Sequence, residues 1–313
     1  MKMNEIKAVI GAVGLGGESV FLSVDHFHGP GETLHAENLY VEAGGKAYNQ
    51  AVAAARLGAD VTFIGAVGED NGGRLCHDVL IEEGIRPVLE TVPGINTAYA
   101  CILTDREGEN RVTVSRGAAD MLSSAFIREN EKAISRCTHL LLGLECPMEA
   151  TVTALEIAKK HGVYTIFNPA PAVPLEFDFL RSFDLITPNQ HEAAVLLGLD
   201  HIPEAAELAK LLCEAKLSNA VVTLGSNGAL LVTPSDKLLF SALKVNAVDT
   251  TGAGDTFNAA LAVAIGGGRS LLEAVEYATN ASAWSVSHPH VLTSLPTAAQ
   301  LGDNWQAVEH VRL

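Results

Sequence analysis

The chain has 313 residues, 48% of them hydrophobic, which is enough for the core of one large α/β domain or of two ordinary ones. Its 21 Lys and Arg against 37 Asp and Glu give a formal net charge of −16, so the average surface repels nucleic acid and anionic membranes. The five cysteines are scattered and include no C-x-x-C pair, which argues against a zinc site or a disulfide framework. Together these features predict a globular protein of the reducing cytoplasm that binds neither nucleic acid nor membrane.

The first apolar segment, residues 7–17, is interpreted as a buried strand, because Glu5 and Glu18 flank it and no signal-peptide cleavage pattern follows. From there, short apolar runs alternate with helix-like segments along most of the chain. The runs predicted to be strands are residues 61–68, 138–145, 163–170, 183–189 and 220–226. This alternation predicts a three-layer α/β/α sandwich, in which helices cover both faces of a mostly parallel central sheet.

Ligands of such sheets bind beyond the carboxyl ends of the strands. The residues at the predicted strand ends are therefore candidates for a site: Glu145, Asn168, Asn189, Glu192, Thr223 and Gly225.

Two stretches, residues 18–42 and 95–116, do not follow the alternating pattern. They carry β-type segments separated by turn signals, of which residues 104–110 (TDREGEN) are the clearest. Since these segments cannot easily join a parallel core, we expect them to form a small β lid over the strand ends. No repeat, linker or low-complexity tract is present, so residues 1–313 are predicted to form a single domain with this lid.

Residues 248–262 (VDTTGAGDTFNAALA) combine a Gly-Ala-Gly turn, a carboxylate and the start of a helix. Backbone N–H groups of Gly252, Ala253 and Gly254 can approach a ligand closely, and a helix beginning near residue 254 directs its positive end at the same point. The segment thus predicts an anion-binding site, with Asp255 held ionised beside it as a base. The alternative is an ordinary helix start that Asp255 merely caps.

Residues 44–58 (GGKAYNQAVAAARLG) show the same arrangement of two glycines followed by a helix. Lys46 could supply local positive charge, and Asn49 could form hydrogen bonds to vicinal hydroxyls. The alternative for this segment is a surface helix that ends at Gly58.

Together, the two segments resemble the two signatures of the ribokinase family, the PfkB carbohydrate kinases. The stretches LLGLECP, NPAPA, TPNQHEA and VTLGSNGAL follow in the order typical of that family, and the resemblance covers roughly residues 6–296. It implies ATP-dependent phosphorylation of a hydroxymethyl group on a sugar or sugar-like substrate. Such a reaction needs a base, Mg²⁺ and fixed N–H donors, and each has a candidate here.

The resemblance also implies a role for each candidate residue. Asp255 corresponds to the catalytic base, and the backbone of Gly252, Ala253 and Gly254 to the cradle of the transferred phosphate. The N-x-x-E pair that organises Mg²⁺ and phosphate corresponds to Asn189 and Glu192. The positions that line the nucleotide are Thr223, Gly225 and Gly228. The positions that face the substrate are Gly45, Lys46, Asn49 and Glu145. A K⁺ site is implied at Asp249 and Thr251, with its other half within residues 286–294, and the family also suggests a homodimer built through the lids.

Residues 14–19 (GLGGES) depart from the G-S-x-N-x-D pattern with which the family usually opens, and Ser19 occupies the position of the aspartate that grips substrate hydroxyls. The substrate is therefore predicted to differ from free ribose. A nucleoside kinase and a non-catalytic metabolite sensor remain alternatives. The loss of the aspartate favours the sensor, whereas the presence of Asp255, Asn189 and Glu192 favours a catalytically active kinase. A Rossmann oxidoreductase is disfavoured, because Ser19 replaces the last glycine of G-x-G-x-x-G. In the cation loop, His288 and His290 stand where the family tends to have basic and small residues.

Overall fold

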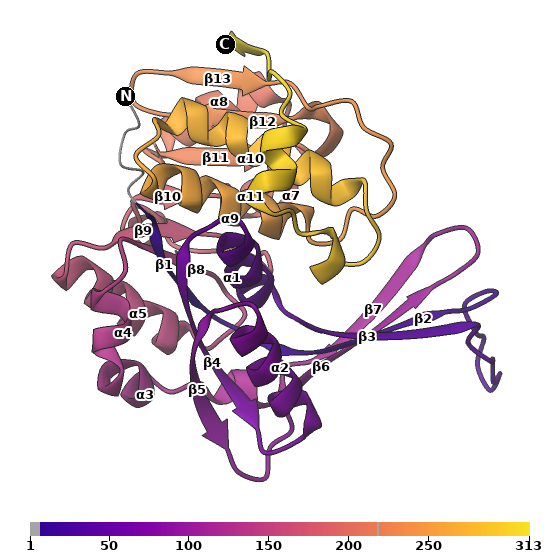
Figure 1. The fold of residues 1–313 in the computed structure, drawn as a ribbon. Helices are drawn as coiled ribbons and strands as arrows, with labels where there is room; N and C mark the ends of the chain where they lie inside the picture. The colour runs from indigo at the N-terminus through magenta and orange to yellow at the C-terminus, as the bar shows by residue number, and fades with distance from the viewer. Residues whose placement is uncertain (1–6, 218) are drawn as a thin grey trace.

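The computed structural model describes residues 7–217 and 219–313, and a large twisted sheet runs through its centre (Figure 1). In spatial order its ten strands are β14 (His310–Arg312), β13 (Lys237–Phe240), β12 (Ala229–Val232), β11 (Ala220–Thr223), β10 (Leu185–Ile186), β9 (Tyr164–Phe167), β8 (His139–Leu142), β1 (Val9–Val13), β4 (Asp60–Gly68) and β5 (Arg86–Val92). Neighbours from β11 to β5 are parallel, whereas β12, β13 and β14 are antiparallel.

Two hydrophobic clusters, one on each face of this sheet, form the core. Neighbouring strand residues alternate between them: Leu141 belongs to one cluster, and Leu140 and Leu142 to the other. The first cluster contains residues of α1 (Lys46–Arg56), α2 (Asn71–Glu82), α9 (Ala253–Gly266), α10 (Leu271–Val286) and α11 (Ala298–Asp303). The second contains residues of α3 (Ser124–Glu129), α4 (Glu131–Ser135), α5 (Met148–Lys160), α6 (Phe177–Leu180), α7 (Gln190–Leu196) and α8 (Ala205–Glu214). The predicted three-layer sandwich is confirmed.

A separate four-stranded sheet extends away from this body and forms the lid (Figure 1). Its order is β3 (Asn38–Gly44), β2 (Gly17–Ser23), β6 (Ala98–Thr104) and β7 (Asn110–Ser115). The hairpin between β6 and β7 spans the predicted turn, where the Thr104 hydroxyl donates to Asn110 Oδ1 at 2.7 Å. Ser19 pairs with Glu42 across β2 and β3, so the two side chains lie on the same face of the lid.

The predicted strands of the core all exist, but most end earlier than expected. The run 138–145 becomes β8, which ends at Leu142, and the run 183–189 retains only two residues as β10. Single backbone bonds continue past these strand ends, such as the one from the Thr187 N–H to Phe167 O at 2.8 Å, and Asn168 Nδ2 adds a side-chain bond to Thr187 O at 2.9 Å. The predicted first strand, residues 7–17, divides at Gly14 into β1 and the beginning of β2.

Three 3₁₀ turns complete the described structure: η1 (Gly117–Met121), η2 (Gly225–Asn227) and η3 (Leu292–Ser294). Within residues 7–217 and 219–313, none of the helices has the length and apolar character needed to cross a membrane.

Candidate active site

The carboxylate of Asp255 lies in the first turn of α9 and is 7% exposed. Its Oδ2 accepts a hydrogen bond from Asn49 Nδ2 at 2.9 Å, and its Oδ1 accepts one from Gln50 Nε2 at 3.3 Å. Helix α1 therefore holds both oxygens of a group that lies more than 200 residues away in the chain. Asn49 and Asp255 were predicted to share a site. Gln50 was missed, although its place directly after Asn49 in the glycine-led helix was a usable signal.

Burial raises the pKa of Asp255, while the charge of Lys46 and the two amide donors oppose this change. In turn, the nearby Asp255 charge is the main cause of a raised pKa at Lys46. We expected the start of the helix to favour the ionised carboxylate of Asp255, but desolvation outweighs that effect. A carboxylate with a raised pKa is a stronger base, which suits proton abstraction from a hydroxyl.

The turn before Asp255 has the backbone geometry that its glycines predict. Gly252 adopts a left-handed conformation (φ 78°) and caps α9. A Cβ at Gly252 would lie 2.7 Å from Val291 Cγ1, whereas a Cβ at Gly254 would meet no atom within 4 Å. The Ala253 N–H bonds to Thr250 O only at 3.3 Å. The first turn of α9 thus has N–H groups without intrahelical acceptors, and the Cβ position of Gly254 beside them is open.

Glu145 follows the end of β8 by three residues and lies against the start of α1. It accepts a hydrogen bond from the Lys46 N–H at 2.7 Å, so it caps the helix. Burial, with a further contribution from the Asp255 charge, raises the pKa of Glu145 to about 7. Lys46, Gln50, Glu145 and Asn168 line one small cavity, so the structure brings the predicted Lys46 and Glu145 together.

Asn189 and Glu192 bond to each other at the start of α7. Asn189 Oδ1 accepts from the Glu192 N–H at 2.8 Å, and Glu192 Oε2 accepts from the Asn189 N–H at 2.8 Å, which forms a capping box. The N-x-x-E pattern therefore caps α7, while its role toward Mg²⁺ and phosphate stays a prediction. Burial raises the pKa of Glu192. Thr223 lies next to Asn189 through an isolated parallel bridge, as expected for neighbouring strand ends.

Besides Gly252, three of the predicted glycines have positive φ angles: Gly45 at 123°, Gly225 at 59° and Gly228 at 95°. A Cβ at Gly45 would lie 2.4 Å from Leu15 O, and one at Gly228 only 1.8 Å from Phe240 O. At these two positions, glycine is required for the close passage of another backbone segment. Gly225 has open space around its Cα, so a side chain there would meet only the strain of the left-handed backbone.

The two halves of the predicted cation loop meet at Asp249. Its Oδ1 accepts from the Thr251 N–H at 2.9 Å, and its Oδ2 accepts from the His290 N–H at 3.2 Å. Asp249 thus joins the Gly-Ala-Gly turn to the segment 286–294. In the described part of the chain, no three His, Cys, Asp or Glu side chains are grouped closely enough to hold a metal by themselves.

Ser19 lies in β2 at the edge of the same site. A Cβ at Gly44 would be 2.8 Å from Ser19 Oγ and 3.8 Å from Asn49 Oδ1, so these polar atoms flank Gly44. Asn49 Oδ1 is buried and has no hydrogen-bond partner. An acceptor of this kind is suited to a hydroxyl of a ligand, because it is otherwise costly to leave unpaired.

Comparison with known proteins agrees with this geometry. The pattern of the pfkB family carbohydrate kinases matches residues 18–298. A ribokinase from Haemophilus influenzae is 37% identical over 279 residues, which cover 88% of this chain and 91% of the relative. A deoxyribokinase from Salmonella typhi is 33% identical over 280 residues, 87% of this chain and 90% of the relative. The structure of an Arabidopsis thaliana ribokinase complexed with ribose and ATP superimposes with a TM-score of 0.86 at 26% identity, covering 95% of this chain and 98% of that one.

The chain belongs to the pfkB family of carbohydrate kinases. It is accordingly an ATP-dependent carbohydrate kinase.

Proposed function

We propose that the enzyme transfers the γ-phosphate of ATP to a hydroxymethyl group of a sugar, with Asp255 as the general base. The observation that carries this assignment is the position of Asp255, which is buried and held through both oxygens directly after the Gly252–Gly254 turn. The base would take the proton of the attacking hydroxyl, while backbone N–H groups of Gly252, Ala253 and Gly254 stabilise the charge that develops on the phosphate.

On the substrate side, we propose that five residues contact the sugar: Gly45, Lys46, Asn49, Glu145 and Ser19. Ser19 supplies one short hydroxyl where an aspartate could accept from two substrate hydroxyls at once, and Asn49 Oδ1 is an unpaired acceptor beside it. We therefore propose a substrate other than free ribose, with a missing or substituted hydroxyl. One relative is a deoxyribokinase, which fits a substrate of this kind. A bulkier nucleoside is the alternative. Gly14, Gly16 and Gly17 add no room for it, because a Cβ at these positions would lie 2.6 Å from Ala47 Cβ, 3.0 Å from Tyr48 Cδ2 and 2.5 Å from Ala98 O, respectively.

For the nucleotide and its metal, we propose Thr223, Gly225 and Gly228 along the ATP, and Asn189 and Glu192 near Mg²⁺. Mg²⁺ commonly binds one or two protein carboxylates together with substrate phosphates and water, so a single carboxylate at Glu192 is compatible with it. The ion would neutralise charge on the phosphates. Asp249 and Thr251 are proposed to border a K⁺ site, where backbone carbonyls of the cation loop would supply further ligands.

The substrate proposal is tested by comparing kcat/KM for ribose, 2-deoxyribose, fructose, other ketoses and nucleosides, in the wild type and in Ser19→Asp. Ser19→Asp should gain activity on ribose relative to the wild type, because the carboxylate restores a two-hydroxyl acceptor. If the wild-type enzyme prefers ribose by tenfold or more, the substitution at Ser19 is neutral and the substrate proposal fails.

A non-catalytic sensor on the same fold is kept as a second candidate because Ser19 replaces the substrate-gripping carboxylate. Thermal-shift measurements with each sugar, with and without Mg-ATP, distinguish the two. A sensor would be stabilised by its ligand without turnover, whereas the kinase would form a phosphorylated product.

We further propose that residues 1–313 form one catalytic domain, that this domain works in the cytoplasm, and that two copies associate through their lids.

A further inference from the structure

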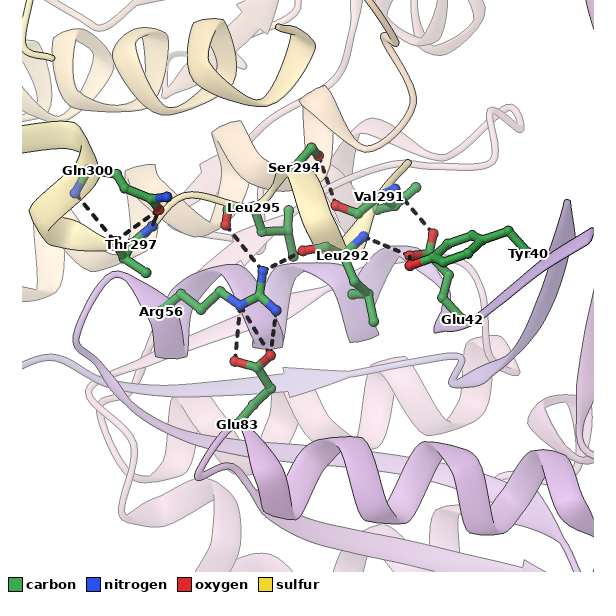
Figure 2. Close-up of polar contacts among 10 residues, drawn as sticks. All are labelled: Tyr40, Glu42, Arg56, Glu83, Val291, Leu292, Ser294, Leu295, Thr297 and Gln300. Carbon is green, nitrogen blue, oxygen red and sulfur yellow. Dashed lines mark hydrogen bonds and ion pairs between the residues drawn. The ribbon is translucent and has the colours of Figure 1, made fainter. Parts of the chain in front are cut away.

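Glu42 is a buried carboxylate on the lid strand β3, and it is only 5% exposed. Its Oε1 accepts a hydrogen bond from the Val291 N–H at 3.1 Å, and its Oε2 accepts one from the Leu292 N–H at 3.0 Å (Figure 2). The Tyr40 hydroxyl reaches Oε2 at 3.4 Å. Both carboxylate oxygens are thus bound to a backbone segment about 250 residues further along the chain.

The segment that Glu42 holds also contacts the anion-binding turn. Val291 Cγ1 occupies the space where a Cβ of Gly252 would stand, so the Val291 side chain packs directly on that glycine. One residue earlier, the His290 N–H bonds to Asp249, whose other oxygen accepts from the Thr251 N–H. The backbone at residues 290–292 therefore lies between the lid and the turn that is proposed to hold the phosphate.

From the opposite side, the body of the protein holds the same segment through Arg56 of α1. Arg56 Nη1 donates to the carbonyls of Leu292 and Leu295, and its guanidinium also forms a salt bridge with Glu83 (Figure 2). Arg56 is the last residue of α1, and Glu83 directly follows the last residue of α2, so both belong to the body. Ser285 of α10 also holds this segment, through a 3.0 Å bond between its hydroxyl and that of Ser294. Arg56 and Ser285 thus anchor the segment to the body, whereas Glu42 anchors it to the lid.

Aromatic contacts of His290 strengthen the attachment to the lid. The His290 ring stacks on Tyr40 with ring centroids 4.1 Å apart, and its edge meets Phe21 at 5.8 Å. Its backbone has a positive φ of 62°, a conformation that residues other than glycine rarely adopt. The strained residue is thus fixed between two lid side chains and Asp249.

We propose that Glu42 is a positioning residue that couples the lid to the anion-binding turn. By fixing the Val291 and Leu292 N–H groups, it sets the position of Val291 against Gly252, and the position of the lid thereby controls the geometry of the phosphate cradle. This inference rests on the proposed role of Gly252, Ala253 and Gly254.

The test uses Glu42→Gln and Glu42→Ala in the full-length enzyme, with Glu37→Gln as the matched control. Glu37 is an exposed lid carboxylate that pairs with Arg106. Misplacement of the cradle should lower kcat by about 10–100-fold, because small shifts of catalytic groups have effects of this size. The KM for the sugar should stay within about threefold, and Glu37→Gln should behave as wild type. A loss confined to thermal stability, with kcat of the folded variant within about twofold of wild type, would overturn the proposal.

A double-mutant cycle with Val291→Ala tests the route of the coupling. If Glu42 acts through Val291, the effects of Glu42→Gln and Val291→Ala on kcat should be clearly less than additive, whereas additive effects contradict the proposed route. Glu42→Gln preserves the side-chain volume, so it serves where Glu42→Ala does not fold.

Amide hydrogen exchange provides a readout that does not require catalysis. In Glu42→Gln, exchange should accelerate at residues 291–292 and also at Thr251 and Thr256, whose N–H groups bond to Asp249 Oδ1 and Gly252 O in the turn. Faster exchange at 291–292 alone would show that the hydrogen bonds exist without coupling to the turn, and would refute the inference. If the wild type phosphorylates no sugar, the proposed function fails separately, since the exchange experiment still decides the coupling.

Discussion

Replacement of Asp255 by Asn removes the proposed base while keeping its shape. In the wild type, both carboxylate oxygens accept amide hydrogen bonds, so the new NH₂ group would face a donor. Asn49 can resolve this conflict by rotating its amide, because its Oδ1 is buried without a partner and can accept from the new NH₂ group. The fold and ATP binding should therefore survive the substitution.

The thermal stability of Asp255→Asn should equal or exceed that of the wild type at pH 8. Burial raises the pKa of Asp255, so ionisation of this group opposes folding, and the stability it contributes is lost as the pH rises through its folded pKa. A neutral amide avoids that cost. Loss of the base should instead lower kcat by roughly 10²–10⁴-fold, which corresponds to about 3–5 kcal/mol in the barrier.

The assay compares kcat, KM for ATP and the melting temperature of Asp255→Asn and wild type. A kcat within about threefold of wild type would remove Asp255 from the role of base. A variant that is inactive because it has lost ATP binding would also contradict the reasoning, since that outcome implies a structural role for the carboxylate.

Three further predictions concern Glu145, the cation loop and the lid. Burial raises the pKa of Glu145 to about 7, above its ordinary value. The stability that protonated Glu145 contributes is therefore present at low pH and is lost as the pH rises through 7. Glu145→Gln should flatten the pH dependence of the free energy of unfolding, measured with urea, between about pH 5 and 8. Replacing K⁺ by Na⁺ or Tris at constant ionic strength should lower activity several-fold, because an ion beside Asp249 would order the turn; equal rates would mean that the loop with His288 and His290 binds no activating cation. The edges of the lid sheet are β3 and β7, and β3 carries the exposed apolar residues Leu39 and Val41. Pairing with a second copy would cover these edges, so sedimentation should show a homodimer. A monomer at micromolar concentration would reject the association through the lids.

The fold could be predicted from the alternation of apolar runs and helical segments, because burial on both faces of a parallel sheet leaves this pattern in the sequence. The lid could be predicted because its segments broke the pattern. Strand ends were less accurate, because the point at which strand pairing stops depends on a neighbouring strand that local sequence does not specify. The bond from Asn168 Nδ2 to Thr187 O, just beyond the end of β9, is of this kind.

The pairing of Asn49 with Asp255 could be predicted only through the family resemblance, since no periodicity links residues 206 positions apart. The capping box at Asn189 and Glu192 has a sequence signature, but the phosphate interpretation of N-x-x-E obscured it. Glu42 carried no signal: an acidic residue within a predicted lid strand is ordinarily solvated, and its burial depends on the path of residues 291–292.

The distance in sequence between these partners has a consequence for how the enzyme acquires its activity. The bonds from Asn49 and Gln50 to Asp255, and from Glu42 to Val291, each join the two ends of the chain. Closure of such long loops is entropically costly and slow, whereas the helices and adjacent parallel strands form from nearer segments. During refolding, therefore, secondary structure should return before catalysis, and the enzyme should remain inactive until the segment that contains Asp255 and Val291 has joined α1 and the lid.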